Sequence, residues 1–105
     1  EALLDEQRLD ANDASEARFY VGESYQNMGE YRKAIEAYYK VSYHGAGGFS
    51  QWITSADFQR AKCHESMGEY ATAIAVYERI VQREGGSTPQ GEMAQEQIVL
   101  LRRRL

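Results

Sequence analysis

The chain has 105 residues, a formal net charge of −4 at pH 7 and a single cysteine, Cys63. A chain of this length is expected to fold as one domain that buries roughly two-thirds of its unfolded surface, so it needs neither a metal nor a disulfide for stability. The acidic balance argues against a nucleic-acid partner, whose phosphates require clustered Lys and Arg, and the lack of an apolar run of about 18 residues argues against direct membrane insertion.

Residues 1–13 are the first predicted element. They contain good helix formers, with three leucines as the only bulky apolar residues, and predict a short helix over residues 2–10. Asn12 and Asp13 interrupt this pattern, and Asp13 with Glu16 forms an acidic variant of a capping box. We therefore expect the helix to end here and to be a cap or the remaining half of a preceding repeat.

Two helices, over residues 14–28 and about 30–43, are predicted to meet at Gly29, since glycine after an apolar-periodic run commonly ends a helix in the left-handed conformation. The apolar face predicted for the first helix comprises Ala17, Val21, Ser24 or Tyr25, and Met28. The face predicted for the second comprises Tyr31, Ala34, Ile35, Tyr38 and Val41. The two helices are therefore expected to form an antiparallel hairpin.

A glycine-rich segment, His-Gly-Ala-Gly-Gly-Phe-Ser, follows at residues 44–50. A phosphate-binding loop would need a preceding strand and a Gly-Lys-Ser/Thr sequence, and the segment has neither. We interpret it as a loop between repeats, with Ser50 as the cap of the next helix.

The hairpin then recurs with a spacing of 39 residues. The sequence Met-Gly-Glu-Tyr occupies residues 28–31 and again residues 67–70. The other identical positions are Ala17/Ala56, Phe19/Phe58, Ala34/Ala73, Ile35/Ile74 and Tyr38/Tyr77. Helices are therefore expected over residues 51–66 and 69–84. A self-similar period of this kind is typical of helical repeat proteins, in which each unit buries its apolar face against its neighbours.

The last predicted helix covers residues 88–104. Gly85 and Gly86 precede it, and Ser87-Thr88-Pro89 supplies a cap residue and an early helical proline. Its expected buried residues are Ala94, Ile98, Leu101 and Leu105. Three consecutive arginines at its end, residues 102–104, complement the negative end of the helix dipole.

The two units resemble tetratricopeptide repeats in their pattern of small and aromatic residues. The matching residues are Gly22, Tyr25, Ala34 and Tyr38 in the first unit and Ala61, Ala73 and Tyr77 in the second. The departures are Arg18 and Asp57 in place of Trp, Arg60 in place of Leu, His64 in place of an aromatic residue, and Ala46 and Gly85 in place of Pro. The resemblance implies an all-α fold in which residues 1–105 form a single α-α superhelix, with repeats at residues 14–46 and 51–85 and a capping helix at residues 87–105.

The C-terminal part, a Gly-Gly-Ser-Thr-Pro loop followed by a terminal helix, resembles a narrower group. Bacterial cell-envelope repeat proteins of the Tol-Pal accessory and outer-membrane assembly lipoprotein kinds share this arrangement. This second resemblance implies a periplasmic location, with the cytoplasm as the alternative.

Cys63 and His64 are the candidates for chemistry. Adjacent helical residues point about 100 degrees apart, so the two cannot form a nucleophile–base pair. By repeat alignment they lie opposite Ser24 and Tyr25, and we interpret both as structural. A metal site shared by His64 and His44 is the alternative. We predict no catalytic residue, no cofactor and no metal.

The resemblance implies a non-catalytic scaffold that binds a peptide or partner helix in the concave groove formed by the first helices of the repeats. The implied groove residues are Glu16, Phe19, Tyr20, Glu23, Gln26, Asn27, Phe58, Gln59, Lys62 and Glu65. The aromatic residues are expected to anchor the partner, and the glutamates to favour basic residues beside these anchors, although they could simply form a solvated helix face. The Lys and Asn combination with which some family members clamp a peptide's C-terminal carboxylate is absent. The alternative function is a self-assembling module that packs through its terminal helices as a homo-oligomer.

Overall fold

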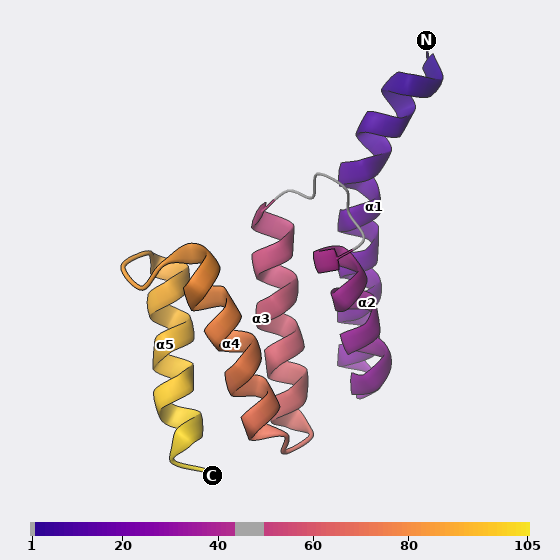
Figure 1. The fold of residues 1–105 in the computed structure, drawn as a ribbon. Coiled ribbons are helices and arrows are strands. Elements are labelled where there is room, and N and C mark those ends of the chain that lie inside the picture. Colours follow the sequence, from indigo (N-terminus) through magenta and orange to yellow (C-terminus); the bar gives the residue numbers. More distant parts are fainter. Residues whose placement is uncertain (1, 44–49) are drawn as a thin grey trace.

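The computed structural model of the protein describes residues 2–43 and 50–105, with side chains from residue 14 to 41 and from residue 52 onward. This part contains five helices and no strand: α1 (Ala2–Asn27), α2 (Tyr31–Tyr43), α3 (Ser50–Ser66), α4 (Tyr70–Glu84) and α5 (Pro89–Arg102). Each helix packs against the next one along the chain, and α1 also contacts α3. Figure 1 shows the resulting row of helices, which confirms the all-α fold class. The predicted loop lies outside the described residues apart from Ser50, which begins α3.

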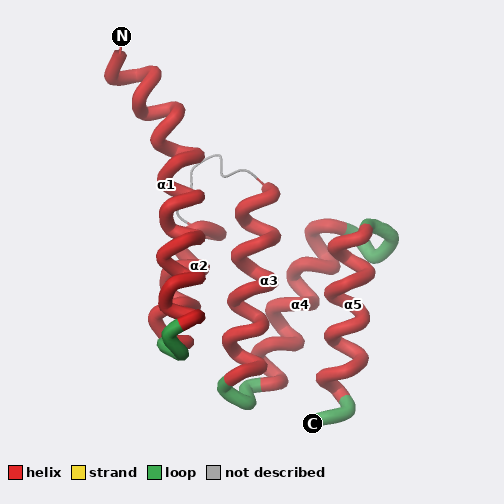
Figure 2. The backbone as a smooth tube through the Cα atoms, turned by 180° about the vertical axis from the view of Figure 1, so that it is seen from behind, coloured by secondary structure: helices red, strands yellow, loops and turns green. Residues whose placement is uncertain are grey.

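Two glycine corners of the same geometry join α1 to α2 and α3 to α4. Gly29 and Gly68 have φ angles of 77° and 75°, the left-handed conformation that ends a helix at low cost when the residue is glycine. The amide of Glu30 donates to the carbonyl of Tyr25, and the amide of Glu69 donates to the carbonyl of His64, both at 2.8 Å. Figure 2 shows both corners in green at the same end of the molecule. The predicted helix–turn–helix corners are therefore confirmed.

Helix α1 differs from the prediction because it runs without interruption from Ala2 to Asn27. The expected break at Asn12 and Asp13 is wrong. Neither residue breaks a helix, since each costs well under about 1 kcal/mol relative to alanine and no glycine or proline stands beside them. The N-terminal turns of α1 extend past the neighbouring helices in both views (Figures 1 and 2).

The buried face of α1 also differs from the prediction. Val21 and Met28 are 48% and 65% exposed, whereas Ser15, Phe19 and Gly22 are buried. Packing against α2 and α3 decides the face: a Cβ atom on Gly22 would lie 2.6 Å from the ring of Tyr38. The tyrosine ring therefore occupies the space that the glycine leaves, and the face opposite this contact is exposed.

The core consists of two clusters, one for each repeat, and α3 contributes to both. Its residues Ala56 and Cys63 pack with Tyr38 in the first cluster, while Ala61 packs with Tyr77 in the second. Both tyrosines are completely buried, as the repeat pattern predicts. The central helix thus joins the repeats by burying residues on two sides.

Helix α5 closes the second cluster. Thr88 caps it by accepting a hydrogen bond from the amide of Gly91 at 3.1 Å, and Pro89 occupies the first helical position. Ala94, Ile98 and Leu101 are buried as predicted, but Leu105 is 74% exposed. The prediction for Leu105 is wrong because α5 ends at Arg102, before the helix can carry Leu105 onto the packed face.

Candidate functional site

A hollow of about 630 Å³ crosses α1, α3 and α5 on one face of the row, and we call it the groove. Its lining residues are Phe19 and Gln26 from α1, Ser55, Phe58, Gln59, Lys62, Glu65 and Ser66 from α3, Tyr77 from α4, and Met93 and Gln97 from α5. Apolar and amide side chains predominate, and Lys62 and Glu65 carry its two opposite charges. The structure therefore brings together six of the residues predicted for the binding surface: Phe19, Gln26, Phe58, Gln59, Lys62 and Glu65.

Phe19 belongs to the core as well as to the groove. It is only 8% exposed, and its ring centroid lies 5.4 Å from the ring centroids of both Tyr38 and Trp52. Phe58 is half-buried and contacts Tyr77 edge to face at 5.8 Å. Each of these side chains therefore lines the groove and also fills space above the tyrosine of its own repeat.

The hydroxyl groups of these two tyrosines bind residues that line the groove. Tyr38 donates a hydrogen bond to the side-chain oxygen of Gln26 at 2.7 Å, and Tyr77 donates one to the carboxylate of Glu65. Buried tyrosine needs a partner for its hydroxyl, and the repeat spacing provides one at the same place in both units. Burial, and then the hydrogen bond to Glu65, raise the pKa of Tyr77. The side chain of Glu65 is thus fixed in the groove by Tyr77 and does not belong to a solvated helix face.

Four predicted residues, Glu16, Tyr20, Glu23 and Asn27, do not line the groove hollow. They lie on α1, and Tyr20 is 51% exposed with its ring against those of Phe19 and Trp52. The charge of Glu16, together with partial burial and a hydrogen bond to Glu16, raises the pKa of Tyr20. These residues form an acidic and aromatic rim beside the groove rather than its floor.

Sequence reasoning missed the contribution of α5. Met93 and Gln97 line the groove, although α5 was expected only to cap the repeats. The available signal was the repeat spacing, because α5 begins at Pro89, 39 residues after α3 begins at Ser50. Helix α5 therefore occupies the position, relative to α3, that α3 occupies relative to the first repeat.

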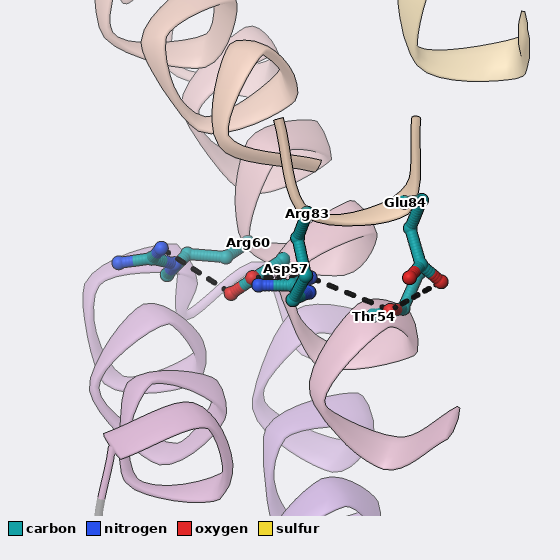
Figure 3. Close-up of polar contacts among 5 residues, drawn as sticks. All are labelled: Thr54, Asp57, Arg60, Arg83 and Glu84. Carbon is teal, nitrogen blue, oxygen red and sulfur yellow. Dashed lines mark hydrogen bonds and ion pairs between the residues drawn. The ribbon is translucent and has the colours of Figure 1, made fainter. Parts of the chain in front are cut away.

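A buried charged network joins α3 to α4 away from the groove (Figure 3). The Asp57 carboxylate is fully buried and lies 3.3 Å from Arg60 and 3.0 Å from Arg83. Thr54 donates to Glu84 at 3.1 Å and accepts from Arg83 at 3.4 Å. The Arg60 guanidinium also lies over the ring of Tyr39 in α2, 5.5 Å from its centroid.

This network explains two departures from the repeat pattern. The pattern prefers apolar residues at the positions of Asp57 and Arg60, which here form an ion pair with each other instead. A buried charge is stable only when it is paired, and Asp57 has two arginines beside it. The network therefore links three consecutive helices, and none of its members lines the groove.

The candidates for chemistry occupy structural positions. Cys63 is fully buried, and burial raises the pKa of its thiol to about 11. The Nδ1 atom of His64 lies 2.8 Å from Glu69, which also forms an ion pair with Arg32 of the preceding repeat. The hydrogen bond from His64, and then that from Arg32, lower the pKa of the Glu69 carboxyl. Cys63 and His64 therefore both support the packing between the repeats.

The part of the chain that the structure describes offers no group of three or more His, Cys, Asp or Glu side chains placed to hold a metal ion. His44, the other member of the metal site considered above, lies outside that part. Over residues 2–43 and 50–105, no helix combines the length and the apolar character needed to cross a membrane.

Both helical hairpins match the same known protein family. The tetratricopeptide repeat matches residues 16–43 and 55–87, which together make up more than half of the chain. No curated protein and no solved structure matches significantly. Repeats of this kind generally mediate protein–protein interactions and are typically non-catalytic. With its two matched segments, its equivalent glycine corners and its helix pairs, the chain belongs to the tetratricopeptide repeat family.

Proposed function

We propose that the protein is a non-catalytic scaffold whose groove binds a peptide or one face of a partner helix. The observation that carries this proposal is the hollow that crosses α1, α3 and α5, because it extends over the first helices of both repeats and over α5. A segment lying across these helices would contact all of them at once, which is how helical repeats use their extended surfaces.

The lining of the groove suits a polypeptide segment. Phe58 and Met93 supply apolar contacts for the side chains of a partner, and Met93 is 56% exposed. Gln59 and Gln97 carry amides that both donate and accept hydrogen bonds, as a peptide backbone does. The mixture provides affinity through apolar burial and orientation through polar contacts.

The charges beside the groove favour a partner that carries basic residues. Glu65 lies in the groove, and Glu16 and Glu23 lie on the rim formed by α1. Charges at a rim mainly accelerate association and select partners, and contribute less to affinity. Lys62 offers a local counterpart for an acidic group of the same partner.

A site-specific photocrosslinker tests the proposal. Placed at Gln59, it should form an adduct with the partner, and Glu65→Gln in the same chain should reduce this adduct, because it removes the groove's negative charge and keeps an oxygen acceptor for Tyr77, as Gln26 does for Tyr38. Placed at Thr72, an exposed position on α4 that lines no part of the groove, it should form none. Adducts from Thr72 alone would place the binding surface elsewhere, and adducts from Gln59 that Glu65→Gln leaves unchanged would exclude the preference for a basic partner. Phe58→Ala is a poorer test because it also removes the contact with Tyr77.

A second candidate function is self-assembly through the terminal helices. It is favoured by the exposed apolar residues of α5, where Val99 is 53% and Leu100 is 51% exposed. The dependence of molecular mass on concentration tests it, and a mass that stays constant would exclude it.

We also propose a periplasmic location in a bacterium, which rests on the style of the Gly-Gly-Ser-Thr-Pro loop and the terminal helix. Fractionation of the source cells tests this location, and recovery with the cytoplasmic fraction would overturn it.

A further inference from the structure

Helix α5 stands at the end of the row and has two different faces. Its inner face packs on the core through Ala94, Ile98 and Leu101. Its outer face exposes about half of Val99 and Leu100, which are adjacent and form one apolar patch. Both side chains line one shallow hollow on this face, and an exposed apolar patch of this kind can serve as a contact with another molecule.

Charged residues of opposite sign flank this patch along the helix. Glu96 precedes it by one turn and Arg103 follows it by one turn, and both are exposed. Arg103 keeps helical backbone angles, φ −69° and ψ −16°, so it continues the direction of α5. Spacings of three and four residues place all four side chains on one stripe.

The stripe is complementary to itself. The midpoint between Val99 and Leu100 is also the midpoint between Glu96 and Arg103. A second α5 turned end for end about this point would place its arginine on the glutamate of the first and its glutamate on the arginine. The two apolar pairs would meet at the centre.

We propose that α5 binds the α5 of a second copy of this chain in an antiparallel pair about a two-fold axis. The axis passes between Val99 and Leu100, and two symmetric ion pairs between Glu96 and Arg103 flank it. The pairing specifies how the self-assembly considered above takes place and does not depend on groove binding.

Charge favours this arrangement over head-to-tail stacking. The opposite end of the row carries Arg18, Lys33, Lys40 and Glu36 around the exposed Val21, so three of these four charged groups are positive. That surface could accept Glu96, but it would also place Arg103 among like charges, which is unfavourable. The antiparallel pair satisfies both charges at once.

The contact is small, so association should be weak. One helix of 14 residues presents far less than the roughly 800 Å² per partner of a standard interface. We therefore expect dimers only at high concentration, and sedimentation equilibrium of the full chain up to about 1 mM is the suitable measurement.

Charge reversal provides the test. Glu96→Arg and Arg103→Glu should each weaken dimerisation at least tenfold, because each variant places like charges opposite one another at both sites. An equimolar mixture of the two variants should dimerise again, since every pair in the heterodimer is then complementary. The double variant Glu96→Arg/Arg103→Glu should also dimerise.

Two variants that replace an exposed apolar residue by serine complete the experiment. Leu100→Ser should abolish dimerisation, whereas Met28→Ser, which removes an exposed apolar side chain at the α1–α2 corner, should leave it unchanged. Circular dichroism confirms that each variant is folded. A wild-type chain that stays monomeric, a double variant that does not recover, or a mass that grows beyond the dimer would overturn the proposal, the last by indicating head-to-tail stacking.

Discussion

Replacement of Asp57 by asparagine tests the buried network most directly, because it removes one charge and almost no volume. The Asp57 and Arg60 side chains are 1% and 8% exposed, whereas Arg83 is 34% exposed. In Asp57→Asn, Arg83 can turn toward water, whereas the buried Arg60 loses the carboxylate that lies 3.3 Å away. Breaking a buried pair in this way costs about 3–5 kcal/mol. We expect this loss in the free energy of unfolding.

Arg60→Leu provides the matched comparison, since the family pattern prefers leucine at this position. The Asp57 carboxylate keeps Arg83 at 3.0 Å in this variant, so the loss should be smaller, about 1–3 kcal/mol. The double variant Asp57→Asn/Arg60→Leu contains no buried arginine at this site. It should therefore be more stable than Asp57→Asn alone. If the two substitutions acted independently, the double variant would instead be less stable than Asp57→Asn.

Urea unfolding followed by circular dichroism at the helical band measures all three variants. Domains of this size are stable by about 5–15 kcal/mol, so the expected loss would shift the midpoint strongly. A loss below about 1 kcal/mol for Asp57→Asn would refute the reasoning. A double variant whose loss equals the sum of the single losses would refute it too, because the two charges would then not depend on each other.

Three further predictions concern the core and the contact between repeats. Tyr38→Ala and Tyr77→Ala should each lower the free energy of unfolding by about 3–5 kcal/mol, since both rings are completely buried, and mild effects in urea melts would contradict this. The raised thiol pKa leaves only about one Cys63 in a thousand ionised at pH 8, so iodoacetamide should react roughly a hundredfold more slowly than with a free thiol until urea unfolds the chain, whereas rapid labelling of the native chain would show an open site. The lowered pKa of Glu69 stabilises the fold above the usual carboxyl pKa of about 4.5, and this contribution is lost as the pH falls through the lowered value. The difference in Tm between the wild type and Glu69→Gln should therefore hold above about pH 4.5 and shrink below it, and a difference that persists in acid would assign the effect to packing.

The helix corners and the core tyrosines could be predicted from the sequence because they depend on local chemistry and on the repeat. Gly29 has the left-handed angle that its position after an apolar run indicates. The buried face of α1 could not be predicted in the same way. Periodicity alone favoured Val21, but the choice depends on where the ring of Tyr38 from another helix fits, and it fits over Gly22.

The groove also combines features that could be predicted from the sequence with features that could not. Its central residues on α3, such as Gln59 and Lys62, follow from the repeat register. The half-buried state of Phe58 and the participation of Met93 depend on how three helices meet, and no single segment encodes that. Asp57 and Arg60 were recognised only as departures from the family pattern, because their pairing also needs Arg83 from a helix that follows in the chain.

The hydrogen bonds from the two core tyrosines determine how the groove behaves before any partner is present. The side chains of Gln26 and Glu65 are each held from below, so their rotamers are selected by the fold itself. When a partner binds, these two side chains therefore lose less conformational entropy than freely rotating side chains would lose. The two equivalent positions also differ, since one is a neutral amide and the other a carboxylate. Of these two positions, a cationic group of a bound segment would therefore gain more beside Glu65 than beside Gln26.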